Sequence, residues 1–100
     1  MVKHVIIWKL KEELGGAEKA EVKKNAKAAL EALCGKIDGL LDIKVLIDFL
    51  PSSNGDMMLD TTFESAEALS AYQVHPDHVS AADSFVRPFT NTRLCCDFEV

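Results

Sequence analysis

The sequence predicts an α+β fold with the split β-α-β arrangement, in which a four-stranded antiparallel sheet carries its helices on one face. Four segments have apolar residues at every second position, which is typical of strands buried on one side. Two other segments have apolar residues spaced with the helical period of about 3.6. The resulting order is β-α-β-β-α-β, and because it fills all 100 residues we expect a single domain over residues 1–100.

The first predicted strand covers residues 2–11, where His4, Ile6 and Trp8 share a face that is apolar apart from the histidine. A helix is expected over residues 17–34, because its apolar residues fall on one stripe while lysines and glutamates occupy the rest of its surface. The stripe consists of Val22, Ala26, Ala29, Leu30 and Leu33.

The middle of the chain has the pattern of a β-hairpin. Strands are predicted over residues 40–50 and 57–64, and the stretch between them, "PSSNGD", is rich in turn-forming residues. Asn54 and Gly55 are expected to supply the positive φ angles of the turn. The apolar face of the first of these two strands is expected to consist of Leu41, Ile43, Val45, Ile47 and Phe49.

The second helical region is expected to be broken in two at Pro76, because proline lacks the amide that a continuous helix needs. Ser65 is expected to cap a first helix over residues 66–72, and a second short helix follows over residues 76–86. A last strand over residues 91–100 completes the sheet. Its apolar face is expected to consist of Thr92, Leu94, Cys96, Phe98 and Val100.

The sheet face that points away from the helices is expected to contact a second copy of the chain. This face is too apolar for full exposure to water and too polar for the core of a monomer. A chain of this length also buries only about 60% of its unfolded surface, so a partner subunit would stabilise it. We therefore expect a homodimer through the sheet face. The face comprises Val5, Ile7, Leu46, Met58 and Cys95 among Asp42, Lys44, Asp48, Asp60, Thr62 and Arg93.

Composition and charge exclude several functional classes. The net charge is −5 and the 11 basic residues are spread along the chain, which argues against nucleic acid as a partner. No apolar run approaches the about 18 to 20 residues that span a bilayer, and the start lacks a signal-cleavage pattern, so we expect a cytoplasmic protein with no membrane partner. The cysteines at 34, 95 and 96 have the spacing of neither a zinc site nor a disulfide framework. Small molecules or other proteins are the expected partners.

The stretch "AYQVHPDHV" contains the candidate catalytic side chains. Pro76 suits the first position of a helix, which makes His75 the N-cap and places His78 in the first turn. The positive end of the helix favours a neutral imidazole at His78, although Asp77 opposes this effect. A neutral His78 beside the hydroxyl of Tyr72 is a workable pair for proton abstraction next to a carbonyl group.

A pocket for a small apolar or aromatic carbonyl compound is expected between the helices and the sheet. His4 would face this pocket from the first strand, and Tyr72 and His78 would face it from the broken helical region. The two expected catalytic residues are His78 and Tyr72. The residues expected to contact the ligand are His4, Ile6, Trp8, Val22, Ala82, Phe85 and Phe89.

Structural explanations of the same residues remain open. A histidine at an N-cap, a tyrosine at a helix end and a histidine in a strand commonly have only structural roles. A metal site at His75 and His78 is not expected, because these residues flank a proline and no cysteine or second carboxylate accompanies them at ligand spacing. The predicted chemistry requires no metal and no cofactor.

Three stretches resemble the stress-responsive A/B barrel domain family, also called Dabb: "VKHVIIWKLK", "FESAEALSAYQVHPDHV" and "CCDFE". The resemblance covers essentially the whole chain and implies a ferredoxin-like protomer that pairs with a second copy into a dimeric α/β barrel. The middle stretch is similar to the plant olivetolic acid cyclase branch of the family. That similarity implies a base at His78, a positioning hydroxyl at Tyr72 and a pocket residue at His4. Val22 and Ala26 stand where that branch has aromatic pocket residues, so the substrate of that branch is not implied.

The expected function is thus that of a homodimeric A/B barrel protein that binds a small carbonyl compound. If it is an enzyme, we expect cofactor-free proton transfer of the cyclase or isomerase type. One alternative is a non-enzymatic ligand-binding or stress-response protein in which the histidine–proline corner is structural. A further alternative is a monooxygenase, because relatives with the same dimeric barrel perform such chemistry.

Overall fold

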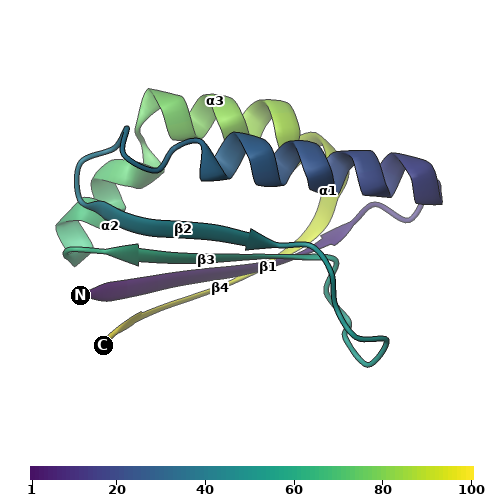
Figure 1. The fold of residues 1–100 in the computed structure, drawn as a ribbon, viewed down its shortest axis with the longest axis horizontal. Coiled ribbons are helices and arrows are strands. Elements are labelled where there is room, and N and C mark those ends of the chain that lie inside the picture. Colours follow the sequence, from purple (N-terminus) through teal and green to yellow (C-terminus); the bar gives the residue numbers. More distant parts are fainter.

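The computed structural model describes residues 1–100 and contains one antiparallel sheet with helices on one face, as the sequence predicted (Figure 1). The strands are β1 (Val2–Leu10), β2 (Leu40–Leu46), β3 (Met57–Phe63) and β4 (Thr90–Glu99). The strand order β2-β3-β1-β4 places the first strand between the third and the last. The helices are α1 (Gly16–Glu31), α2 (Ala66–Gln73) and α3 (Pro76–Phe85), followed by the 3-10 helix η1 (Arg87–Phe89). No helix has the length and apolar character needed to cross a membrane.

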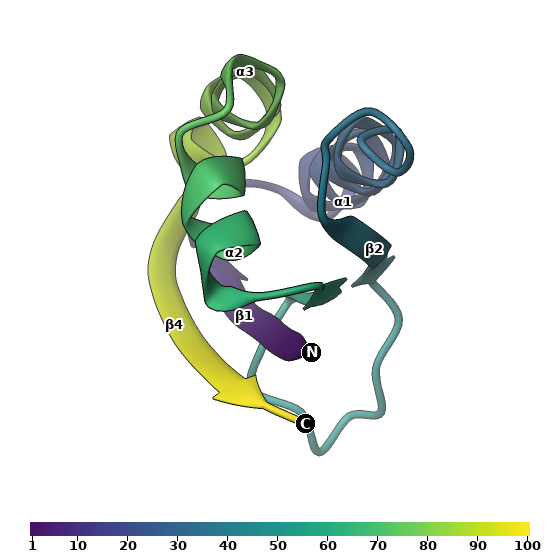
Figure 2. The same ribbon diagram turned by 90° about the vertical axis from the view of Figure 1, so that its left-hand side faces the viewer.

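The hydrophobic core lies between the sheet and the helical layer (Figure 2). On β1, His4, Ile6 and Trp8 are buried in this layer, which confirms the predicted alternation. Helix α1 covers them with the predicted stripe, of which Val22 and Leu30 are buried. Burial of each large apolar side chain contributes roughly 1.5–3 kcal/mol, so this shared core holds β1 rigidly beneath the helices.

Strand β2 departs from strict alternation at Leu41. Leu40 and Asp42 pair with consecutive residues of β3, so that Leu41 is the extra residue of a β-bulge. The bulge shifts the alternation by one position, which buries Leu40 and leaves Leu41 46% exposed. The prediction that Leu41 shares the core face with Ile43 and Val45 is therefore wrong.

The connection between β2 and β3 is longer than predicted. Strand β2 ends at Leu46, so residues 47–56 form a loop that projects from one end of the sheet (Figure 1). The amide of Ser53 donates a hydrogen bond of 2.9 Å to the carbonyl of Leu50 and closes a tight turn within the loop. The hairpin itself is confirmed, because β2 and β3 pair antiparallel.

The predicted positive φ angles at Asn54 and Gly55 are wrong. The only positive φ angles in the chain occur at Gly35 and Gly39, in the connection between α1 and β2. A glycine is required at position 55 for a different reason: a Cβ atom there would lie 2.7 Å from Cγ2 of Ile7. Gly55 thus allows the loop to approach β1 closely.

Strand β4 turns the opposite face toward the helices from the one predicted. His4 pairs with Asp97 and Ile6 pairs with Cys95, and residues directly opposite in antiparallel strands point to the same side of a sheet. Cys95, Asp97 and Arg93 therefore lie on the helical side, and the prediction that Cys95 and Arg93 belong to the face away from the helices is wrong. The residues predicted to form the core face, Thr92, Leu94, Cys96, Phe98 and Val100, are all exposed. Figure 2 shows β4 at the edge of the sheet, curving toward α3.

Replacing Gly39 with alanine is expected to destabilise the fold strongly. A Cβ atom at position 39 would lie 2.5 Å from Cβ of Ala68 in α2, and the φ angle of +83° is unfavourable for any residue with a side chain. We expect the free energy of unfolding, measured by urea denaturation, to fall by about 2–4 kcal/mol. The double variant Gly39→Ala/Ala68→Gly should recover part of the loss, because it removes the clash and retains the φ strain. An unchanged denaturation midpoint in Gly39→Ala would contradict the close packing of α2 against Gly39.

Candidate functional site

Two capping residues begin the helices on either side of the corner at Pro76: Ser65 at the start of α2 and His75 at the start of α3. The hydroxyl of Ser65 accepts a hydrogen bond from the amide of Ala68 at 3.1 Å, and Nδ1 of His75 accepts one from the amide of Asp77 at 3.1 Å. Pro76 occupies the first turn of α3, as predicted. The imidazole of His75 thus caps the N-terminus of α3. This cap positions the side chains in the first turn of the helix.

His78 projects from the first turn of α3 against Tyr72. The two ring centroids are 4.2 Å apart and the rings are inclined by 36°. Nδ1 of His78 lies 3.3 Å from the carbonyl oxygen of Gln73, an atom that can only accept a hydrogen bond. The proton of a neutral His78 therefore sits on Nδ1, and Nε2 carries the free lone pair.

The surroundings of His78 favour its neutral form. Burial lowers the pKa of the His78 imidazole, and the positive charges of Arg87, His4 and Arg93 lower it further against the opposing effect of the hydrogen bond to Gln73. A neutral imidazole with a free Nε2 is the form that can accept a proton at neutral pH.

Tyr72 is fully buried, and its hydroxyl has no hydrogen-bond partner. Burial raises the pKa of this hydroxyl well above its ordinary value, so the phenol stays protonated throughout the physiological range. A buried hydroxyl without a hydrogen-bond partner costs roughly 1–3 kcal/mol of stability. The Tyr72 hydroxyl is therefore a donor available to a bound molecule.

A cavity of about 80 Å³ lies between β1 and the corner, and Tyr72 and His78 both line it. By the same measure one water molecule needs roughly 10–15 Å³, so the cavity has room for a small organic group. Six of the predicted site residues come together here: His4, Ile6, Trp8, Tyr72, His78 and Ala82. Arg87 and Arg93 also line it. Neither was predicted as a site residue, and Arg93 was expected on the opposite face of the sheet.

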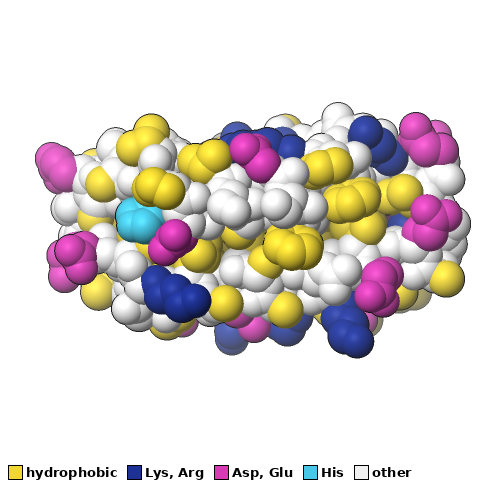
Figure 3. Space-filling view, turned by 90° about the horizontal axis from the view of Figure 1, so that it is seen from above, with side chains coloured by type: hydrophobic (Ala, Val, Ile, Leu, Met, Phe, Trp, Pro, Cys, Tyr) yellow, Lys and Arg dark blue, Asp and Glu magenta, His cyan; other side chains and the backbone are white.

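The other three predicted pocket residues lie elsewhere. Val22, Phe85 and Phe89 line a separate groove of about 310 Å³ between α1 and the end of α3, so the expectation of one common pocket is wrong for them. Phe85 follows His78 by two helical turns, which is a rise of about 10 Å along α3, and this rise carries it beyond the cavity. Figure 3 shows hydrophobic side chains gathered among charged ones on the helical surface.

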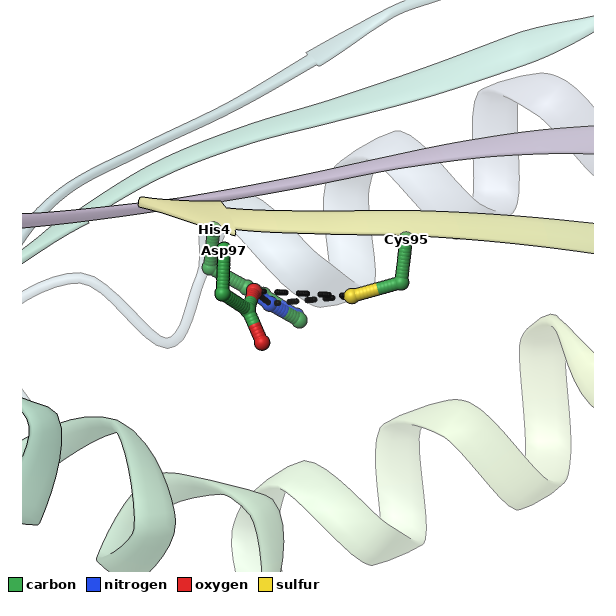
Figure 4. Close-up of side chains that lie close together, drawn as sticks. All are labelled: His4, Cys95 and Asp97. Carbon is green, nitrogen blue, oxygen red and sulfur yellow. Dashed lines mark hydrogen bonds and ion pairs between the residues drawn. The ribbon is translucent and has the colours of Figure 1, made fainter. Parts of the chain in front are cut away.

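His4 is held in place from two sides. The hydroxyl of Thr61 donates a hydrogen bond of 2.6 Å to the His4 carbonyl, and Nδ1 of His4 is paired with the carboxylate of Asp97 (Figure 4). The ring itself is almost completely buried and lies edge-on to Tyr72, with 6.3 Å between the centroids. Asp97 was not identified from the sequence; the β1–β4 register, which places it opposite His4, is the signal that would have indicated it.

His78 is expected to titrate below the ordinary histidine pKa of about 6.5, because burial disfavours its charged form. The stability that depends on the neutral form of His78 is then complete above about pH 6.5. It is lost as the pH falls through the folded-state pKa, because the unfolded chain binds the proton at a higher pH than the folded chain does. NMR titration of the imidazole signals and urea unfolding at several pH values below 6.5 measure both effects. The variant His78→Asn should lose less stability than the wild type over that range. A His78 midpoint above about 6.5 would contradict the neutral state.

The geometry defines a class: a ferredoxin-like α+β domain with a small cavity between sheet and helices, into which a phenol and a neutral imidazole project. A family model identifies the class further, because the stress responsive A/B barrel domain, Dabb, matches residues 2–100. The chain belongs to this family. No curated protein sequence matches it at a significant level.

Solved structures agree with the family assignment. A dimeric protein of unknown function with a ferredoxin-like fold from Bacteroides fragilis is 30% identical, with a TM-score of 0.93 over 99% of this chain and 95% of the other. A dimeric ferredoxin-like protein of unknown function from Jannaschia is 27% identical, with a TM-score of 0.77 over 99% and 98% of the two chains. The hydroxynitrile lyase of Passiflora edulis is 15% identical, with a TM-score of 0.71 over 97% and 90%, and shares the fold alone.

Proposed function

We propose that this protein binds a small apolar or aromatic carbonyl compound in the Tyr72–His78 cavity and catalyses proton transfer next to the carbonyl group without a cofactor. The observation that carries the proposal is the fully buried, unpartnered Tyr72 hydroxyl beside a neutral imidazole in one cavity. A donor for the carbonyl oxygen and an acceptor for the adjacent proton are the two groups that such a reaction needs.

In the proposed step, Nε2 of His78 takes a proton from the carbon next to the carbonyl group. The electron pair of the broken C–H bond moves into the carbonyl group, and the resulting enolate oxygen accepts a hydrogen bond from the hydroxyl of Tyr72. Return of the proton to carbon gives exchange or isomerisation, and attack of the enolate carbon on a second carbonyl gives cyclisation. His78 is neutral again once the proton has left it.

The walls of the cavity support this role. Ile6 and Trp8 supply apolar surface, so a bound carbonyl compound is removed from water and hydrogen bonds to it are strengthened. Arg87 and Arg93 add positive charge at the same cavity. Arg87 is paired with Asp83, whereas Arg93 has no ion-pair partner, so its charge is free to stabilise a developing enolate.

The fold alone does not indicate which reaction the protein catalyses, because structural neighbours at low identity include a hydroxynitrile lyase. The proposal can be tested by exchange of carbon-bound hydrogen for deuterium in D₂O, followed by NMR. Acetone, phenylacetone and acetophenone form a probe series that increases in size and aromatic character. We expect the protein to accelerate exchange of at least one of these compounds above the rate in buffer. Binding without accelerated exchange would support a non-enzymatic ligand-binding protein and overturn the catalytic proposal.

We also propose that the protein is a homodimer through the sheet face that points away from the helices. Three large apolar side chains are exposed on this face: Ile7 by 39%, Leu94 by 63% and Phe98 by 48%. Ile7 and Leu94 pair directly across β1 and β4, so they form continuous apolar surface. The Bacteroides fragilis and Jannaschia structures are of dimeric proteins, which supports the same assembly here.

A further inference from the structure

His4, Cys95 and Asp97 bring three different ligand atoms together on the helical side of the sheet (Figure 4). Cys95 and Asp97 are two residues apart on β4, and His4 lies directly opposite Asp97 on β1. Nδ1 of His4, Sγ of Cys95 and a carboxylate oxygen of Asp97 all lie within 4.8 Å of one another. Neighbouring strands thus hold an imidazole, a thiol and a carboxylate around one point.

The distances within the cluster suit a tetrahedral metal ion. Sγ of Cys95 lies 3.7 Å from Nδ1 of His4 and 3.4 Å from Oδ1 of Asp97. Zinc bonds of about 2.3 Å to sulfur and about 2.0–2.1 Å to nitrogen or oxygen require ligand atoms separated by about 3.5 Å. The remaining pair, His4 and Asp97, is in direct hydrogen-bond contact, so the Asp97 carboxylate must rotate away from the ring. Its side chain is 40% exposed on an edge strand, which leaves room for that rotation.

We propose that His4, Cys95 and Asp97 form a binding site for one thiophilic divalent cation of the Zn²⁺ class. Mixed nitrogen, sulfur and oxygen ligands select this class, whereas Mg²⁺ and Ca²⁺ require oxygen ligands. His4 is also a wall of the Tyr72 cavity, so the ion would lie beside that cavity. Three protein ligands leave one tetrahedral position for water or a bound molecule. The inference is independent of the proposed proton transfer, and it revises the expectation that the chain holds no metal.

The surroundings make the site rigid on its imidazole side. β1 lies in the interior of the sheet, and Thr61 anchors the His4 carbonyl by a buried hydrogen bond of 2.6 Å. A ligand held in this way loses little freedom when it binds a metal.

A catalytic Cys–His–Asp triad is a poorer explanation of the same cluster. In a triad the thiol and the carboxylate contact different nitrogens of the ring, whereas here both approach Nδ1 of His4.

The site can be tested with Co²⁺ and the full chain under a non-thiol reductant. We expect one equivalent of Co²⁺ to give a sulfur-to-cobalt charge-transfer band and intense tetrahedral visible bands, both abolished by Zn²⁺. Cys95→Ser should lose the charge-transfer band and weaken cobalt binding by at least about tenfold, the scale of loss that even outer-shell changes produce. Cys96→Ser is the matched control, because Cys96 is adjacent in sequence and lies on the opposite face of β4.

Each outcome of this titration decides the proposal. A band that is present in the wild type and in Cys96→Ser, absent in Cys95→Ser and weakened in Asp97→Asn supports it. Absence of the band in the wild type, persistence of the band in Cys95→Ser, or equal losses in the two cysteine variants would overturn it. Circular dichroism checks that each variant is folded. We expect the cysteine variants to fold, because both cysteines are exposed.

Discussion

The His78→Ala variant is expected to lose the acceleration of hydrogen exchange by about 10²–10⁴-fold, the usual contribution of a positioned general base. The loss follows from the geometry: Nε2 of His78 carries the free lone pair, and Nδ1 is committed to Gln73. His78 is only partly buried, so its removal should leave the fold intact. The measurement is the exchange rate of the best probe ketone in D₂O, with circular dichroism as the check on folding.

Two controls make the His78→Ala result specific. His75→Asn removes the neighbouring imidazole and retains an N-cap side chain, so its exchange rate should match the wild type. Added free imidazole should restore part of the exchange in His78→Ala, because the deleted ring leaves space beside Tyr72. Full activity in His78→Ala, or an equal loss in His75→Asn, would eliminate His78 as the base.

Replacing both Leu94 and Phe98 with glutamate is expected to convert the dimer into a monomer of 11.0 kDa. The substitutions place charges on the apolar outer face of β4, where burial against a second copy would require the removal of water from each carboxylate. Sedimentation velocity or light scattering at micromolar concentration measures the mass directly.

The matched control for the dimer prediction is Val74→Glu. Val74 is 77% exposed and lies at the corner after α2, away from the outer sheet face, so this variant should remain a dimer. A wild-type mass of one chain, or a dimer that survives both substitutions on β4, would contradict the proposed interface.

The predictable part of the fold is the part in which one face of an element is buried and the other is not. On β1, every second side chain is buried, including His4, Ile6 and Trp8, and the residues between them are intermediate or exposed. This period of two indicated both the strand and its buried face. The corner at Pro76 was equally clear, because proline restricts the backbone whatever surrounds it. These features also determine the position of Tyr72 and His78, which explains why the candidate site could be predicted.

Strand β4 was predictable as a strand but not in its orientation. Its apolar alternation belongs to the outer face, where Leu94 and Phe98 are exposed, and the helical side carries Cys95 and Asp97. A shift of one residue in register exchanges the two faces, and no local pattern distinguishes a core face from a face that is apolar for another reason. The pairing of His4 with Asp97 and the cluster with Cys95 were missed for this reason.

The predicted pocket included too many residues, because helical periodicity indicates the direction of a side chain around the helix axis but not its position along that axis. Phe85 shares a face with His78 and nevertheless lines another groove, beside Val22. The bulge at Leu41 was missed for a comparable reason, since one extra residue is visible only in the pairing with β3.

The most direct test of the central claim, that Tyr72 and His78 act on one bound molecule, is a double-mutant cycle of hydrogen exchange. Rates are measured for the wild type, Tyr72→Phe, His78→Ala and the double variant with the same ketone in D₂O. We expect Tyr72→Phe to slow exchange in the wild-type background and to have little further effect once His78 is alanine, because the hydroxyl stabilises an enolate that only the base generates. Fold-losses that multiply in the double variant, or a Tyr72→Phe variant as fast as the wild type, would contradict the account.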